Sequence, residues 1–181
     1  MRAIALESER LRYQPLDSSF ISQSYVDWMN DKVVNTYLQT GGNYTKEILE
    51  SFLREVEKQD ILFWAIVVKG NNKHIGNIKI DPVNTRFRTG EYGILLGERS
   101  EWGKGYAKEA SQSIIDFCFS NTVNLRKITL GVVEDNVGAF ELYKKLGFVQ
   151  EGFYKKHECY NGKWCNVIRM AFFNPNINFD E

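Results

Sequence analysis

The 181-residue sequence has few of the residues that build covalent or metal-bound frameworks. It contains three cysteines and two histidines, and no cysteine pair has the CxxC spacing of a zinc site or a redox motif. Small secreted disulfide scaffolds are much richer in cysteine, so that class is excluded. Because neither histidine has a metal-ligand partner at a recognisable spacing, we expect no metal.

The sequence also lacks an excess of one charge. Its 23 Lys and Arg residues balance 23 Asp and Glu residues, whereas nucleic-acid-binding domains usually carry a basic excess. No apolar run approaches the roughly 20 residues of a membrane span. Residues 1–11 carry four charged side chains, which is atypical of a signal peptide. We therefore expect a cytoplasmic protein with neither nucleic acid nor membrane as a partner.

Aromatic residues are plentiful by contrast. They make up 14% of the chain, with twelve Phe, nine Tyr and four Trp, which is enough material for a core and excludes a disordered tail. Only three prolines occur, and no Pro/Gly/Ser-rich linker, internal repeat or low-complexity tract divides the chain. The length suits one folded unit, so we predict a single domain over residues 1–181.

The first half of the chain predicts an antiparallel meander flanked by helices. Thr45 is a typical N-cap residue, and the apolar residues that follow it recur on one helical face. That face is expected to contain Ile48, Leu49, Phe52, Leu53 and Val56. Expected strands cover 11–16, 61–68 and 91–96, with a further one marked by Ile75, Ile78 and Ile80, and expected helices cover 18–29 and 45–59. We interpret His74 as a surface strand residue.

The second half has a different pattern. A strand over 91–96, a helix over 106–119 and a strand over 127–133 fit a right-handed crossover between parallel neighbours. A helix over 137–146 ends at Gly147, and 148–157 and 164–173 form a hairpin around Asn161-Gly162. The expected fold class is α+β, with a mixed, mostly antiparallel sheet of about seven strands and about four helices.

The first chemical motif is the hexad Trp102-Gly103-Lys104-Gly105-Tyr106-Ala107, between an expected strand and helix. The first N–H groups of a helix, together with its dipole, favour an anion such as a phosphate or diphosphate. The hexad is not a Walker A loop, because no Gly-Lys-Ser/Thr closes it, and it lacks the third glycine of a dinucleotide fingerprint. An ordinary tight turn is the alternative.

The second motif is N-V-G-A-F-E-L-Y-K-K-L-G-F, from Asn136 to Phe148. Asn136 opens a helix, and Tyr143 lies two helical turns further along the same face. Both side chains could therefore contact one ligand. The alternative is an N-cap asparagine followed by a core tyrosine.

The two motifs, in this order and separation, resemble the GNAT superfamily of N-acetyltransferases. The resemblance covers residues 11–173, and the segment Tyr160-Asn161-Gly162-Lys163 is similar to the ribosomal-protein-alanine and spermidine N-acetyltransferase branch. It implies acetyl-CoA as the donor, a GNAT-like sheet with a splayed parallel pair, and no metal. One departure is Trp102, where the family usually has Gln or Arg.

The resemblance also implies roles for individual residues. The hexad amides would hold the diphosphate of acetyl-CoA, the strand end at Leu95-Leu96-Gly97 would pair with the pantetheine arm, and Asn136 would bond that arm. The implied cofactor-binding residues are Leu95, Leu96, Gly97, Trp102, Gly103, Lys104, Gly105, Tyr106, Ala107, Asn136 and Tyr143.

Amine acetylation needs a base, because an alkyl amine with a pKa near about 10 is protonated at neutral pH. Glu91 is the favoured base from its strand position and the resemblance. Glu98, Glu134 and His157 are alternatives, and a solvated surface charge is the ordinary fate of a glutamate. Tyr143 is the expected general acid for the leaving thiolate, and a strand N–H near Leu96 or Gly97 is the expected oxyanion donor.

The acceptor stays open at this point. A protein N-terminus, an amino sugar and a polyamine are all compatible, with contacts expected from residues 25–37 and from the closing hairpin. Four glutamates of the helix 45–59 could line a polyamine site, although a solvated face explains them equally well. A catalytically silent CoA-binding sensor is the alternative function, and a homodimer is a further expectation.

Overall fold

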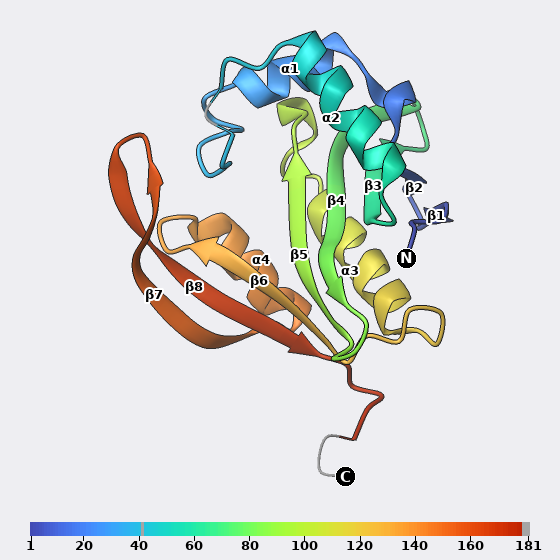
Figure 1. Cartoon of the computed structure of the whole chain (residues 1–181), viewed down its shortest axis with the longest axis vertical. Helices are drawn as coiled ribbons and strands as arrows, with labels where there is room; N and C mark the ends of the chain where they lie inside the picture. The colour runs from blue at the N-terminus through green and yellow to red at the C-terminus, as the bar shows by residue number, and fades with distance from the viewer. Residues whose placement is uncertain (41, 179–181) are drawn as a thin grey trace. The chain divides into compact units, whose positions relative to one another are not determined.

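The computed structural model describes residues 1–40 and 42–178 of the chain (Figure 1). In this part of the chain eight strands form one sheet, in the order β1-β2-β3-β4-β5-β6-β8-β7, and four α-helices accompany it. The strands are β1 (Leu6–Glu7), β2 (Leu11–Pro15), β3 (Leu62–Val68), β4 (Lys73–Asn84), β5 (Thr89–Leu96), β6 (Lys127–Val133), β7 (Val149–Tyr160) and β8 (Lys163–Phe173). The α-helices are α1 (Gln23–Asn30), α2 (Lys46–Lys58), α3 (Tyr106–Phe119) and α4 (Val137–Leu146).

The expected fold class is confirmed, with eight strands in place of about seven. The added strand is β1, which has two residues and pairs antiparallel with β2. Strand β5 pairs parallel with β6 from Thr89 to Glu91, as the crossover predicted, and the sheet is otherwise mostly antiparallel. The strands β5 and β6 were also expected to diverge beyond their paired residues, and this remains a prediction.

The chain divides into two compact units, each made of two segments. One unit comprises Met1–Asp81 and Gly93–Ala110, and the other comprises Pro82–Tyr92 and the chain from Ser111 onward. The hexad lies in the first unit, whereas Glu91, Asn136 and Tyr143 lie in the second. A single domain over 1–181 remains a prediction.

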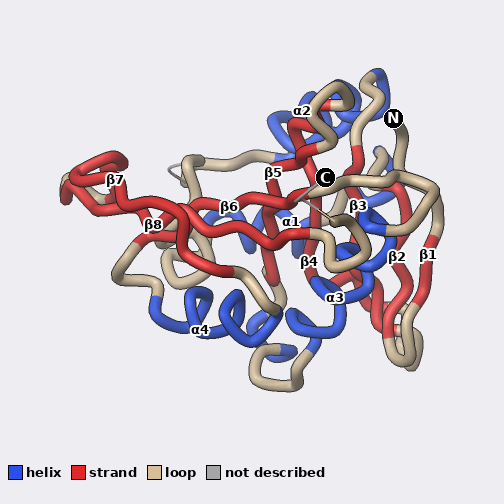
Figure 2. The backbone as a smooth tube through the Cα atoms, turned by 90° about the horizontal axis from the view of Figure 1, so that it is seen from below, coloured by secondary structure: helices blue, strands red, loops and turns tan. Residues whose placement is uncertain are grey.

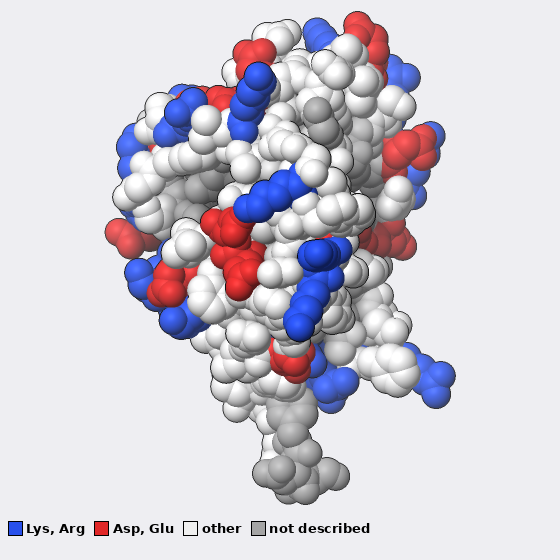
Figure 3. Space-filling model, turned by 90° about the vertical axis from the view of Figure 1, so that its left-hand side faces the viewer, with Lys and Arg blue, Asp and Glu red and all other residues white. Residues whose placement is uncertain are grey.

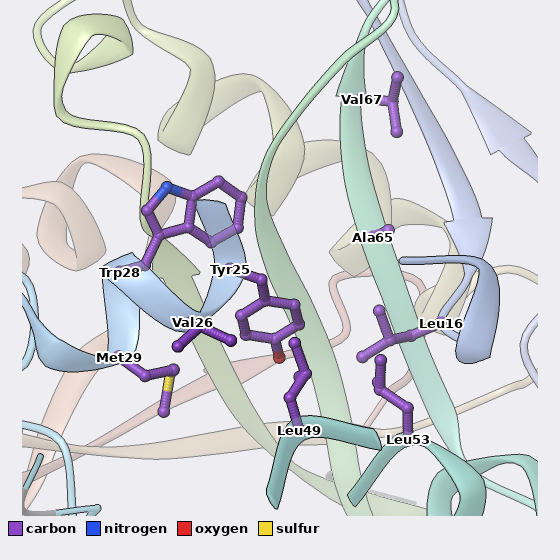
Figure 4. Close-up of a cluster of buried hydrophobic side chains, with 9 residues drawn as sticks. All are labelled: Leu16, Tyr25, Val26, Trp28, Met29, Leu49, Leu53, Ala65 and Val67. Atoms are coloured by element: carbon purple, nitrogen blue, oxygen red, sulfur yellow. The ribbon is translucent and has the colours of Figure 1, made fainter. Parts of the chain in front are cut away.

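Helices α1 and α2 of the first unit pack on β3 (Figure 4). Their shared core contains Leu16, Tyr25, Val26, Trp28, Met29, Leu49, Leu53, Ala65 and Val67. Thr45 caps α2 as predicted, but the buried face is narrower than expected, since Ile48 and Phe52 remain 46% and 36% exposed. The helix expected over 18–29 is instead a short 3-10 helix followed by α1. Asp17 is the N-cap of the 3-10 helix, and Ser22 is the N-cap of α1.

His74 was interpreted as a surface strand residue; it does lie in β4, but its side chain is half-buried among aromatic rings. Its ring lies 4.8, 5.7 and 5.0 Å from the ring centroids of Phe20, Tyr25 and Trp28. Burial lowers its pKa, and Nε2 lies 3.0 Å from both the Gly76 carbonyl and the Asn77 side-chain oxygen. The β3–β4 register shifts at Ile66/Val67, so simple alternation along the sequence could not place this side chain.

In the second unit β6, β8 and β7 lie side by side, with α4 along one face (Figures 1 and 2). Strand β6 and helix α4 have the predicted boundaries. Gly147 ends α4 with a left-handed φ of 105°, where an added Cβ would lie 3.0 Å from the Phe172 ring. Asn161 and Gly162 both have positive φ angles, as the tight turn of the β7–β8 hairpin requires.

Candidate active site

The hexad forms an open cradle of amides at the start of α3. Gly103 and Gly105 have φ angles of 76° and 84°, a region that only glycine adopts at little cost. Among the residues that the structure describes, none accepts a hydrogen bond from the amides of Gly103, Lys104, Gly105 or Tyr106. Unpaired amides at the start of a helix can bind an anion such as a phosphate.

The cations around this loop are paired with carboxylates. Lys104 Nζ donates to Glu101 Oε2 at 2.8 Å, and this contact raises the pKa of Lys104. Arg10 Nε donates to Glu109 Oε2 at 2.7 Å. Since Lys104 and Arg10 each have a counter-charge, the amides and the helix dipole remain the main attraction that the hexad itself offers an anion.

Trp102 connects the hexad to the end of β5. Its indole Nε1 donates to the Leu96 carbonyl at 2.9 Å, and the Gly97 amide donates to the Ile75 carbonyl at 3.0 Å. The Trp28 ring packs so closely on Gly97 that an added Cβ would lie 2.1 Å from it. The Gly97 amide is therefore already bonded within the protein, which makes it a poor candidate for the expected oxyanion donor.

Asn136 is the N-cap of α4. Its side-chain oxygen accepts from the Ala139 amide at 3.3 Å, as the N-cap alternative predicted. Its side-chain NH₂ group has no acceptor within the described ranges. The same residue can therefore cap the helix and still donate to a ligand.

Tyr143 is a buried phenol with a free hydroxyl. It is 8% exposed, and its ring packs against Tyr92 and Phe148 at centroid distances of 5.7 and 5.9 Å. No residue in the described part of the chain forms a hydrogen bond with its hydroxyl. Burial raises the pKa of Tyr143 to about 12, so the group stays protonated near neutral pH and can donate.

Glu91 is held by an arginine from β8. Arg169 Nη1 and Nη2 donate to the two Glu91 oxygens at 2.7 Å each, and the Thr129 hydroxyl donates to Oε2 at 2.5 Å. The pKa of Arg169 is raised by this contact. Three of about four acceptor positions of the carboxylate are thus occupied. Sequence reasoning missed Arg169, which lies 78 residues from Glu91.

A hollow of about 510 Å³ lies beside this ion pair, within the second unit. Glu91 and Thr129 contribute to its wall, together with the residues around the β4–β5 turn. No motif predicted it, because its wall combines short segments of β4, β5 and β6.

The other acidic candidates also have partners. Glu98 accepts from the Ser100 hydroxyl at 2.6 Å and lies 3.1 Å from Lys73, and these contacts lower its pKa. Glu134 accepts from the Asn166 side chain at 2.8 Å. Glu91 is engaged at least as fully as these two glutamates, so hydrogen-bond partners alone do not rank the three as bases.

His157, the remaining alternative, packs its ring on Tyr154 at 4.8 Å. The glutamates of α2 are also engaged: Glu50 and Glu55 pair with Arg54 and Lys58 of the same helix, and Glu57 accepts from the Ser18 amide. These pairs favour the interpretation that the glutamates of α2 form a solvated helix face, rather than the lining of a polyamine site.

Charge is distributed evenly over the surface that Figure 3 shows, where Lys and Arg lie interspersed with Asp and Glu. Across the described residues, no group of three or more His, Cys, Asp or Glu side chains could hold a metal ion. No helix in residues 1–40 and 42–178 is long and apolar enough to cross a membrane.

Comparison with known proteins adds relatives of named activity. Spermidine N(1)-acetyltransferase of Escherichia coli K12 is 29% identical over 169 residues, which are 93% of this chain and 83% of that protein. The uncharacterized N-acetyltransferase p20 of Bacillus licheniformis is 33% identical over 108 residues, but this match spans only 60% of either chain.

Solved structures share the fold. Spermidine N-acetyltransferase from Vibrio cholerae, in complex with CoA and spermine, aligns with a TM-score of 0.81 and 24% identity over 92% of this chain and 97% of that one. A GNAT-family acetyltransferase from Bacillus anthracis also has a TM-score of 0.81, with 22% identity, over 94% and 99% of the two chains.

The acetyltransferase (GNAT) domain model matches residues 10–149. This range includes the hexad, Glu91, Asn136 and Tyr143, and it covers more than half of the sequence. The chain therefore belongs to the GNAT acetyltransferase family.

Proposed function

We propose that this enzyme transfers an acetyl group from acetyl-CoA directly to a primary amine. The observation that carries the proposal is the set of unpaired amides from Gly103 to Tyr106 in a chain of the GNAT family. Bound acetyl-CoA supplies an activated thioester, and no covalent enzyme intermediate is required. A catalytically silent CoA-binding module is the alternative function.

In this proposal the hexad amides bind the diphosphate, and the free NH₂ of Asn136 donates to the pantetheine arm. Tyr143 serves as the acid. A phenol with a pKa of about 12 is a weaker acid than a thiol with a pKa of about 8.5. Its contribution is thus a hydrogen bond that stabilises negative charge developing on sulfur. The phenol proton is shared with the sulfur in this bond and is not fully transferred to it.

The titration of acetyl-CoA into the protein tests the cofactor assignment. We expect one bound molecule per chain and a rise in melting temperature that grows with ligand concentration, because the ligand stabilises only the folded state. Calorimetry gives the Kd, and light scattering on the same samples tests the expected homodimer. The absence of both binding heat and a melting shift at saturating acetyl-CoA would remove the assignment.

Glu91 is the proposed base, and its ion pair with Arg169 allows two variants to be compared. Glu91→Gln removes the carboxylate, whereas Arg169→Met leaves the carboxylate and removes its partner. If Glu91 accepts the amine proton, Glu91→Gln lowers kcat by about a hundredfold and Arg169→Met lowers it much less. Equal losses of kcat in the two variants, each with a similar fall in melting temperature, would show that the ion pair stabilises the fold. They would exclude the role of Glu91 as the base.

The acceptor is proposed to be a primary amine of small size. Relatives named spermidine N(1)-acetyltransferase, similar over 93% of this chain, support a small amine. A peptide N-terminus and an amino sugar are the other candidates. Polyamines, N-terminal alanine peptides and amino sugars should therefore be assayed separately by CoA release, and the acceptor with the highest kcat/KM defines the class.

A further inference from the structure

One arginine near the N-terminus contacts three successive residues of the hexad. Arg10 lies between β1 and β2, and its Nη1 donates to the Lys104 carbonyl at 2.9 Å. Its guanidinium carbon lies 4.6 Å from the centre of the Tyr106 ring. Its Nη2 is beside Gly105, where an added Cβ would lie 3.5 Å away. A segment distant in sequence thus supports the loop from one side.

Glu109, in the first turns of α3, fixes this arginine. Its Oε2 accepts from Arg10 Nε at 2.7 Å, and its Oε1 accepts from the Arg10 amide at 2.8 Å and the Ser8 hydroxyl at 2.7 Å. The Glu109 side chain is 15% exposed, whereas that of Arg10 is 43% exposed. Partial burial alone would raise the pKa of Glu109, but the bonds from Arg10 and Ser8 outweigh it and lower the pKa.

The bond to the Lys104 carbonyl determines where the next amide points. The carbonyl of Lys104 and the N–H of Gly105 belong to one planar trans peptide, so they point in opposite directions. The Lys104 carbonyl points toward Arg10, from which it accepts a hydrogen bond. The Gly105 N–H therefore points away from Arg10. Glycines on both sides of Lys104 leave this peptide free to rotate unless something holds it.

We propose that Arg10, held by Glu109, is a positioning residue that keeps the amides of the hexad directed at the cofactor diphosphate. This inference rests on the proposed function. Direct anion binding is not the main role of Arg10, because Nε and Nη1 are already used and Glu109 neutralises its charge. Its planar fork bonds a carboxylate and a carbonyl at the same time, which a lysine in its place could not do.

The test uses Arg10→Met, which keeps an apolar side chain over Tyr106 and removes every side-chain donor. Arg2→Met is the matched control, since Arg2 is an exposed arginine of the same segment, paired with Asp60 at 3.6 Å and without contact to the hexad. Calorimetry measures the Kd for CoA, and NMR relaxation without ligand measures the order parameters of the amides of residues 103–106. Arg10→Met should raise the Kd about tenfold, the loss expected for one charge-assisted bond.

The same variant should lower these order parameters, because the peptide between the two glycines loses its restraint, while the melting temperature changes little. Glu109→Gln keeps one acceptor oxygen and should weaken CoA binding less than Arg10→Met. Unchanged Kd and order parameters in Arg10→Met, equal weakening in Arg2→Met, or lower order parameters throughout the chain would each overturn the proposal. If the unaltered protein binds no CoA, the proposed function fails, while lower order parameters confined to the hexad would still support the positioning role.

Discussion

Replacing Tyr143 by phenylalanine is expected to lower kcat about a hundredfold while the Kd for acetyl-CoA stays the same. The physical reason is that the hydroxyl has no partner in the described residues and remains protonated, with a pKa of about 12. Its hydrogen bond becomes valuable only as charge develops on sulfur, so its loss affects the transition state rather than the bound ground state. Steady-state kinetics with a titration of the donor separate the two effects.

Tyr92→Phe is the matched control, because Tyr92 belongs to the same aromatic cluster and its hydroxyl bonds Ser111 at 2.6 Å. Losing that buried bond should reduce the free energy of unfolding by about 1 kcal/mol and leave kcat nearly unchanged. A Tyr143→Phe enzyme with the normal rate would remove the acid role. A rate loss shared by Tyr92→Phe would assign it to altered packing.

Replacing both hexad glycines by alanine is expected to weaken acetyl-CoA binding about a hundredfold, because each alanine costs about 1–2 kcal/mol in the left-handed region. The φ angles of Gly103 and Gly105 are 76° and 84°. Alanine at these positions favours a different loop conformation, in which the amides no longer converge on one anion. Calorimetry with acetyl-CoA measures the change.

The control for this prediction is Gly70→Ala. Gly70 lies in the β3–β4 turn with an ordinary φ angle, and an added Cβ would have no neighbour within 4 Å. This variant should bind acetyl-CoA like the unaltered protein. A Kd that is unchanged in the double glycine variant would contradict the amide cradle, whatever the outcome for Tyr143.

Local signals in the sequence were sufficient for β6, α3 and α4. The strand and helix boundaries of β6, α3 and α4 follow from periodicity, capping residues and Gly147, all of which act over a few residues. The hexad was predicted to present open amides because the first N–H groups of a helix have no partner within the helix.

Long-range contacts could not be predicted. The partner of Glu91 is 78 residues away, and the partners of Arg10 in the hexad and α3 are more than 90 residues away. His74 was misplaced because a register shift between β3 and β4 breaks the alternation that a single strand suggests. Trp102 was predicted to contact the cofactor, and its bond to the Leu96 carbonyl depends on how the loop folds back.

The most direct test of the account is turnover with defined amines. The purified protein is incubated with acetyl-CoA and, in turn, a polyamine, an N-terminal alanine peptide and an amino sugar, while CoA release and the acetylated amine are both quantified. The account predicts that at least one amine is acetylated in equal amount to the CoA released, and that Tyr143→Phe slows this reaction. Tight acetyl-CoA binding without product from any of the three amines would contradict it and favour a silent CoA-binding module.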